Sequence, residues 1–423
     1  MKKFTICVFT FVASYSLPLY AQDNNTDTQV DYNEQESQEL RLALTKISLY
    51  TETREFAKAS ALIEELKVKY PDNPQVLVAA ADLNLRMENR GSAYYYINKA
   101  HNLDPLNEDI IERRILALQE SGPFVAFGAS TRDSNQADEN FLNASGRVFY
   151  TPTLSSDIIA ENNSLESKGD VIRADGSSSP FEGDKQRATV TVSNIFNEGQ
   201  IATGKLHFGN ENIGAGVAYS MPDRWGSSAI DANINQPDWS FIETVVGDGT
   251  KDNISIARKQ HLITNLDGVL GLGFNHYNLE DESDIASSAA VNLGLGYNYP
   301  YSYEQGYETS FAANYTVDAE YFSDRTELLN DVGGTYSPFP AVSYEIHAVT
   351  VSALQNLYST LSLDAYAGFA KDRLGSSGPL FGGGITYAPI KSMSIEFAAS
   401  RGIIGESRIG TVDQYGVNVR FKW

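Results

Sequence analysis

Apolar and polar residues alternate along the later part of the chain. Between positions 289 and 299 the large apolar side chains occupy every second position, and mainly glycine, asparagine and alanine stand between them. The segment 311–321 repeats this arrangement. A period of two predicts a β-strand with one apolar and one polar face. The same pattern predicts further strands at 186–196, 199–208, 212–221, 268–278, 357–370, 380–388 and 391–400.

The earlier part of the chain has a helical pattern. Only two of the 33 glycines lie at or before position 122. Ala59 and Ala93 are 34 residues apart, and so are Pro71 and Pro105. This period is typical of tetratricopeptide repeats, in which a small residue lets paired helices approach and a proline ends the second helix. The sequence predicts about two and a half repeats, with an unrelated helical bundle as the alternative. The predicted helices lie near 36–52, 55–69, 74–89, 92–103 and 107–120.

Three features favour a transmembrane barrel over a soluble sandwich, which also alternates. The apolar faces end in tyrosines such as Tyr297, Tyr299 and Tyr321, as expected of aromatic girdles at lipid interfaces. The opposite faces are rich in glycine, asparagine and acids, which suits a wet lumen. An alternating aromatic segment also closes the sequence, and it resembles the signal that the outer-membrane assembly machinery reads. That segment contains Tyr415, Val417, Val419, Phe421 and Trp423.

The predicted fold class is α + β multidomain: a short tetratricopeptide α-solenoid followed by a transmembrane antiparallel β-barrel. Residues 123–423 would give ~19 to 21 residues for each strand with its turn in a barrel of 16 or 14 strands. Even strand numbers are usual, so 16 strands are predicted and 14 is the alternative. Two stretches with little alternation, Pro222–Lys251 and Ser323–Pro340, are predicted as long loops that either fold inward or cap the outside.

The first residues have the features of a secretory signal peptide rather than of an anchor helix. Lysines at positions 2 and 3 precede an apolar stretch from Phe4 to Ala13, and the run ending at Ala21 matches a small-residue cleavage site. The single cysteine, Cys7, would leave with the peptide. The predicted organisation is a signal peptide at 1–21, a flexible lead-in at 22–34, a periplasmic helical domain at 35–122 and an outer-membrane barrel at 123–423.

The chain is acidic, with 54 acidic against 32 basic side chains and a formal charge of −22. Binding to nucleic acid phosphates requires a basic surface, so no nucleic-acid partner is expected. The five histidines show no zinc-binding spacing, and the glycines at 382–384 lie within a strand pattern rather than a phosphate loop. A Ser-His-Asp set without an elbow motif is a weak alternative. We therefore predict no enzyme activity, no cofactor and no metal.

Several charged side chains stand on the predicted inward faces of the strands. One interpretation is that these charges pair across the lumen and stiffen it. The other is that they form an electronegative passage, which would favour a cationic or neutral polymer over an anionic one. Arg420 and Lys422 also lie on inward positions, and His347 lies beside the set. The predicted lining residues are Glu308, Asp318, Glu320, Glu345, Asp364, Glu396, Arg187 and Lys205.

Short motifs within the barrel carry a resemblance to a known family. The segments Tyr315–Tyr321, Tyr344–Ala348 and Asp281–Pro300 resemble the outer-membrane exporters of synthase-dependent exopolysaccharides, most closely those of the Pel system. The family also includes the poly-N-acetylglucosamine and cellulose exporters, which join periplasmic tetratricopeptide repeats to a C-terminal barrel. Its members carry long repeat arrays, whereas this chain has about two and a half repeats.

The resemblance implies an outer-membrane channel that guides an exopolysaccharide outward, with periplasmic proteins docked on the repeats. A partly deacetylated, cationic polymer would agree with the acidic inward set, so neutralising Glu308, Asp318 and Glu320 together is expected to reduce export. Two other classes stay open: a general or substrate-specific porin, and a barrel-anchored protein that binds partners through its repeats. Outer-membrane lipid and the barrel assembly machinery are further expected partners.

Overall fold

The structure is a computed structural model, and it describes most of the chain beyond residue 33. The predicted signal peptide, nearly all of the lead-in and Trp423 lie outside the described residues. The described range is 34–422 without positions 54, 88, 122, 152, 174, 197–199, 224, 280–281, 304–306, 330–334, 340, 359, 374, 391 and 404–410.

Five helices precede the barrel in the described chain, and each lies close to a predicted position. They are α1 (Glu34–Glu52), α2 (Phe56–Lys69), α3 (Pro74–Arg86), α4 (Arg90–Leu103) and α5 (Glu108–Ser121). The start of α3 shows why the sequence folds this way. The Asn73 side chain accepts hydrogen bonds from the backbone N–H groups of Gln75 and Val76, and Pro74 occupies the first helical turn. None of the described helices is long and apolar enough to cross a membrane.

Helices α2 to α5 pack on one another in chain order. Ala59 and Ala93, the equivalent alanines of the 34-residue period, are both completely buried. Small side chains at these positions let neighbouring helices approach closely. The helix positions are confirmed, while the assignment of these helices to the tetratricopeptide class stays a prediction.

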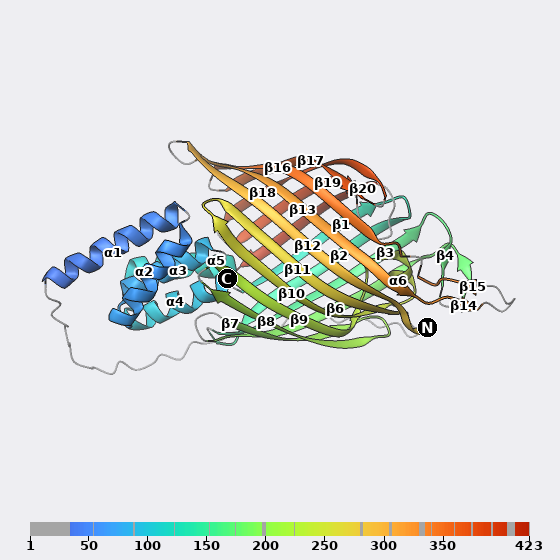
Figure 1. The fold of residues 1–423 in the computed structure, drawn as a ribbon, viewed down its shortest axis with the longest axis horizontal. Helices are drawn as coiled ribbons and strands as arrows, with labels where there is room; N and C mark the ends of the chain where they lie inside the picture. The colour runs from blue at the N-terminus through green and yellow to red at the C-terminus, as the bar shows by residue number, and fades with distance from the viewer. Residues whose placement is uncertain are drawn as a thin grey trace. The chain divides into compact units, whose positions relative to one another are not determined.

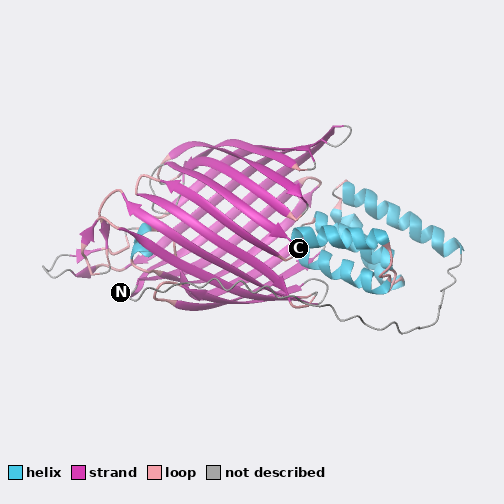
Figure 2. Cartoon of the chain, turned by 180° about the vertical axis from the view of Figure 1, so that it is seen from behind, coloured by secondary structure: helices cyan, strands magenta, loops and turns pink. Residues whose placement is uncertain are grey.

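The later part of the chain forms an antiparallel sheet that closes on itself (Figures 1 and 2). The described residues contribute sixteen strands to it, as predicted. In barrel order they are β1 (Phe124–Asp133), β2 (Ala137–Phe149), β3 (Leu154–Ser167), β6 (Glu182–Phe196), β7 (Gln200–Phe208), β8 (Ile213–Asp223), β9 (Gly226–Pro237), β10 (Thr250–Ile263), β11 (Leu266–Leu279), β12 (Glu282–Tyr303), β13 (Tyr307–Arg325), β16 (Tyr344–Tyr358), β17 (Leu361–Asp372), β18 (Ser377–Ile390), β19 (Met393–Ile403) and β20 (Thr411–Lys422). Pairing of β1 with β20 closes the barrel.

Smaller elements lie in the connections between barrel strands. One connection contains the short helix α6 (Ile242–Val246). Two others contain small two-stranded sheets that stand apart from the barrel. These are β4 (Val171–Ile172) with β5 (Ser178–Ser179), and β14 (Leu328–Leu329) with β15 (Thr335–Tyr336).

The strand register assigns every position to the inside or the outside of the barrel. Residues that face each other directly across an antiparallel pair point to the same side. Leu293 of β12 faces Leu270 of β11 and Val317 of β13, and this apolar row belongs to the outer face. The next position, Asn292, faces Gly271 and Asp318 and belongs to the lumen. The alternation read from the sequence therefore has the correct phase in β12 and β13.

The two ends of the barrel differ in their connections. The base is the end at which β1 begins and β20 ends, and the top is the opposite end. Connections at the base are two to four residues long, whereas the top carries the long connections 168–181, 238–249 and 326–343. The prediction of a long loop over Pro222–Lys251 is wrong for most of these residues, because β9 occupies much of the range. The predicted loop Ser323–Pro340 largely coincides with 326–343.

Candidate functional site: the barrel lumen

One part of the lumen wall carries charges that neutralise each other. Its inward ion pairs join side chains of neighbouring or next-neighbouring strands between β1 and β9. They are Arg132–Glu139, Arg147–Asp157, Arg187–Glu161 and Lys205–Asp231. The three arginine Nε atoms lie 2.6 to 2.7 Å from their carboxylate oxygens. Two of the predicted lining residues, Arg187 and Lys205, are thus held in pairs, so this part of the wall is the stiffened one.

The wall from β12 through β13 and β16 to β19 has a different inner surface. Its inward positions are mainly small or uncharged residues, such as Gly294, Thr316 and Gly382. Among them stand the exposed carboxylates of Asp318, Asp364 and Glu396. Within the described part of the chain, none of the three lies within 4.0 Å of a lysine, arginine or histidine nitrogen. This wall therefore presents negative charge without a counter-charge of its own.

The three unpaired acids are spread along the height of the barrel. Asp364 and Glu396 each lie four residues into a strand that starts at the base, because β17 begins at Leu361 and β19 at Met393. Asp318 lies in the half of β13 nearer the top. The carboxylates consequently follow the lumen from one end toward the other. At the base the inward cations Arg420 and Lys422 belong to the closing strand β20, where Arg420 lies 4.8 Å from the centre of the Phe124 ring.

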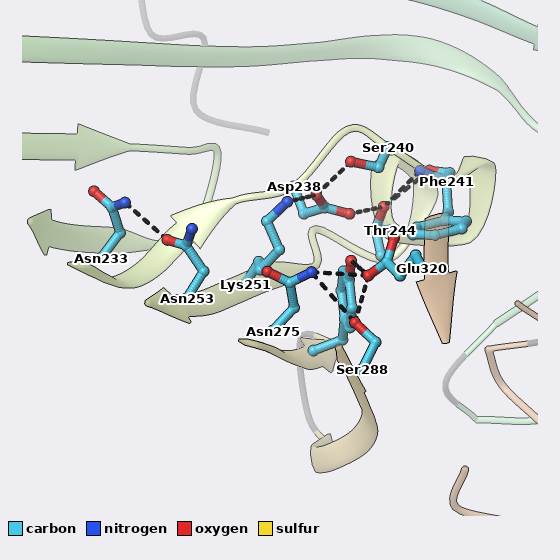
Figure 3. A network of polar contacts seen from close by, with 11 residues as sticks. Asn233, Asp238, Ser240, Phe241, Thr244, Lys251, Asn253, Asn275, Ser288 and Glu320 are labelled. Carbon is cyan, nitrogen blue, oxygen red and sulfur yellow. Dashed lines mark hydrogen bonds and ion pairs between the residues drawn. The ribbon is translucent and has the colours of Figure 1, made fainter. Parts of the chain in front are cut away.

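Glu320 occupies a buried pocket just above Asp318. One of its carboxylate oxygens accepts hydrogen bonds from the Asn275 side chain at 2.8 Å, from the Tyr277 hydroxyl at 2.7 Å and from the Ser288 hydroxyl. These donors come from β11 and β12 (Figure 3). The carboxylate is only 6% exposed, so its hydrogen bonds replace the water that burial removes. Glu320 therefore fixes the wall and is less available to a passing molecule than Asp318.

Residues 238–249, which we call the inner segment, fold into the lumen between β9 and β10. The buried Asp238 carboxylate organises this segment, accepting hydrogen bonds from the hydroxyls of Ser240 and Thr244, both at 2.9 Å. The Lys251 ammonium lies 3.5 Å from the same carboxylate (Figure 3). The backbone N–H of Gly249 donates to the Thr244 carbonyl, and a Cβ at position 249 would lie 2.8 Å from Thr244. A larger residue at 249 would therefore disrupt the turn.

The inner segment reaches across the lumen from one wall to the other. On one side Lys185 of β6 pairs with Asp248 at 2.5 Å, and the Arg187 guanidinium lies 4.2 Å from the Trp239 ring centre. On the other side the Phe241 ring packs against Tyr277 of β11. Every residue of α6 is buried between these contacts. The segment therefore narrows the top of the lumen, and Figure 2 shows the short helix at that end of the barrel.

Two apolar clusters hold the inner segment against the upper wall. One joins α6 to the β2–β3 side and contains Ala137, Leu165, Val171, Ile242, Val245 and Val246, with Phe181 and Trp239 packed on it. The other joins it to the β11–β13 side and contains Phe241, Tyr277, Leu279, Ile285, Ala286, Phe339 and Ala341, with Phe322 packed on it. Phe339 belongs to the top connection 326–343, so that loop also folds onto the inner segment.

One predicted lining residue points the wrong way. Glu345 faces Ala319 in the register, so it lies on the outer face and not in the lumen. Its carboxylate accepts a hydrogen bond from the Tyr321 hydroxyl, and Tyr321 shares that outer face. A carboxylate is tolerated there because neighbouring side chains supply donors. Glu308 lies in β13 opposite Ser302, but its side chain falls outside the described residues.

The sequence did not single out the residues that hold the inner segment. Lys185 and Arg187 of β6 are far along the chain from their partners Asp248 and Trp239 in the inner segment, and only the closed sheet brings them together. One signal was present: the run Phe241–Val246 breaks the alternation and is mostly apolar within a polar connection. An apolar run in a loop indicates a segment that packs on something.

The predicted assembly signal lies in β20 as an outward row. Val417 and Phe421 face Phe397 and Met393 of β19, and Tyr415 faces Ala399 on the same side. Val419 continues the row, and Trp423 lies outside the described residues. The row consists of side chains on the face that lipid would contact.

Comparison with known proteins assigns the fold. No protein-family model matches the sequence, and no curated relative matches it. The structure is similar to a bacterial polysaccharide outer membrane secretin, with a TM-score of 0.52, 9% identity, and coverage of 71% of this chain and 98% of that chain. Lower TM-scores relate it to OprB of Pseudomonas putida (0.38, 10% identity, 75% and 98% covered) and OmpF of Salmonella typhi (0.36, 12% identity, 71% and 97% covered). The chain thus shares the closed β-barrel fold of that secretin.

Proposed function

We propose that this protein is an outer-membrane channel that guides an exopolysaccharide out of the cell. The observation that carries the proposal is the unequal lumen wall. Charges on the β1–β9 wall are paired, whereas Asp318, Asp364 and Glu396 on the other wall are exposed and unpaired. The small neighbour Gly294 leaves room near Asp318, because a Cβ at position 294 would meet nothing nearer than 3.7 Å. A cationic or neutral sugar chain fits such a surface, and an anionic one is repelled.

The likeness to a polysaccharide secretin agrees with this proposal at the level of the fold. The loop lengths supply an orientation, because outer-membrane barrels have short periplasmic turns and longer extracellular loops. By that rule the base faces the periplasm and the top faces outward. The helical part that enters β1 at the base then lies in the periplasm, where we propose that it docks partner proteins or the polymer. We also propose that the protein is related to the Pel-type exporters, on the sequence resemblance of its barrel motifs.

A specific observation also favours a second candidate, a substrate-specific porin. The inner segment narrows the lumen from within, as a selectivity loop would. The two candidates differ in what passes: an exporter admits an extended polymer once the segment moves, and a porin admits only small solutes. Oligosaccharides of increasing length therefore separate them.

The experiment measures ion selectivity and oligosaccharide block in planar bilayers. The protein is used with residues 239–247 replaced by a glycine-serine linker, so that the lumen is open in every variant. We expect cation selectivity from the reversal potential in a KCl gradient, and voltage-driven block by long glucosamine oligomers. The triple variant Asp318→Asn, Asp364→Asn, Glu396→Gln should lose most of both effects.

The matched control is Asp413→Asn, which removes one acid from the outer face of β20. It should leave selectivity and block unchanged. If the triple variant shows the same ion selectivity and oligomer block as the linker protein without the three substitutions, the acidic wall is refuted as the polymer contact. The porin is tested on the protein with its inner segment intact, where entry of short oligomers alone would favour it.

A further inference from the structure

The outer face of the barrel carries a polar cluster near the top, where an apolar surface would be expected. We call it the outer cluster. It consists of Tyr315 and Tyr321 of β13, Glu345 and His347 of β16, Lys371 of β17, and Arg373 directly after β17. The register places Glu345 and His347 opposite Ala319 and Val317, on the side that faces away from the lumen. Lys371 faces His347 from β17 and so lies on the same side.

Glu345 is the organising residue of the outer cluster. Its carboxylate accepts hydrogen bonds from the Tyr321 hydroxyl at 2.5 Å and from one Arg373 nitrogen, Nη1, at 2.9 and 3.2 Å. His347 Nε2 lies 2.9 Å from the same carboxylate, and His347 Nδ1 lies 2.7 Å from the Tyr315 hydroxyl. The Glu345 side chain is 11% exposed, so its own charge is covered by these partners.

The cations of the outer cluster remain accessible, unlike the acid that holds them. The Arg373 side chain is 70% exposed and uses only Nη1 on Glu345, which leaves donors on Nε and Nη2 directed elsewhere. Lys371 is exposed, and in the described part of the chain it forms no ion pair. One buried acid therefore accompanies two exposed cations. The cluster presents positive charge and hydrogen-bond donors toward the membrane.

We propose that the outer cluster binds a phosphate group of a phosphorylated glucosamine lipid in the outer leaflet. Arginine and lysine held side by side match the charge and the oxygen geometry of a phosphate ester. Lys371 and Arg373 are only two residues apart and both are exposed, so both can donate hydrogen bonds to one phosphate. Long top connections place this end of the barrel in the outer leaflet. The tyrosine rings offer apolar surface for the lipid sugar.

The test is native mass spectrometry of the purified full-length protein with added lipid. The probes are diphosphorylated lipid A, its dephosphorylated form and phosphatidylglycerol. We expect the wild-type protein to retain diphosphorylated lipid A at concentrations at least about tenfold below those needed for either other lipid, a factor that corresponds to 1.4 kcal/mol. The variant Lys371→Gln/Arg373→Gln should lose this preference.

Arg401→Gln is the matched control, because Arg401 is another cation on the outer face near the top, opposite Phe381 and 3.5 Å from Asp413. It should bind lipid A as the wild type does. Unchanged binding by the double variant, or an equal loss in the Arg401 control, would overturn the proposal. Equal retention of phosphatidylglycerol would also overturn it, because the cluster would then recognise any anionic lipid. Heat-modifiable migration on a gel verifies that each variant is folded.

Discussion

Phe241 holds the inner segment in place, so its replacement should open the lumen. The ring is fully buried, and its centre lies 4.7 Å from that of Phe339, 5.7 Å from Tyr277 and 6.0 Å from Phe322. Truncation of such a phenylalanine to alanine costs about 3–5 kcal/mol. The loss acts on local opening of the segment, because the barrel strands keep their own hydrogen bonds. At 1.4 kcal/mol for each factor of ten, the open population should rise between ~100-fold and several-thousand-fold.

The assay is single-channel recording of the Phe241→Ala protein in planar bilayers. Wild-type protein should show rare, brief openings, and the variant should show long ones with the same unit conductance. The control is Phe127→Ala, which removes a half-exposed ring from the outer face of β1. It should leave the open probability near that of the wild type. A folded Phe241→Ala barrel with wild-type open probability would refute the argument that this ring keeps the lumen closed.

Three other predictions concern separate parts of the chain. Lys185→Glu should place a second negative charge against Asp248 and destabilise the closed inner segment by on the order of 3 kcal/mol. The double variant Lys185→Glu/Asp248→Lys, which exchanges the two charges, should restore most of the closed state in the same single-channel recordings. Phe421→Ser should lower the yield of folded barrel in the membrane, measured as the heat-modifiable fraction, while total protein before assembly stays constant. Burial lowers the pKa of His101, so the folded helical part resists its protonation. The stability that this histidine contributes is complete above its unfolded pKa and falls as the pH drops below about 6.5. Thermal melts followed by circular dichroism at pH 7.5 and 5 should show this loss of stability. The variant His101→Gln should show a smaller difference between the two pH values.

Periodicity was sufficient to predict the regular parts of this fold. The segments 289–299 and 311–321 lie within β12 and β13 with the correct face inward, because a wet lumen and an apolar exterior impose opposite chemistry on alternate residues. The helix positions followed from glycine scarcity and from the 34-residue period. In contrast, β9 was overlooked. Its outward row contains Ile230, Ala232 and Ile234, but serines precede it and Pro237 ends it, so it looked like a loop.

Long-range contacts explain what the sequence could not provide. The position of the inner segment depends on Lys185 and Asp248, which are 63 residues apart, and local pattern carries no information about such a pair. Glu345 was assigned to the lumen face, and this was wrong because its partners could not be recognised from the local sequence. Its polarity indicated the lumen, yet hydrogen bonds from Tyr321 and Arg373 allow it to lie outside. Polar residues near a membrane interface therefore need their partners before their direction can be assigned.

The seam between β1 and β20 has a consequence for the order of folding. Phe124 pairs with Lys422, so this contact joins residues 298 positions apart (422 − 124), whereas His261 and Asp267 at the β10–β11 turn are separated by six (267 − 261). Loop-closure entropy makes the seam costlier than the turn by about 3.5 kcal/mol. Hairpins should therefore form in succession along the sheet, with the seam as the final and slowest step. Until then β1 and β20 present unpaired edges, and a helper that holds these edges would control the rate of assembly.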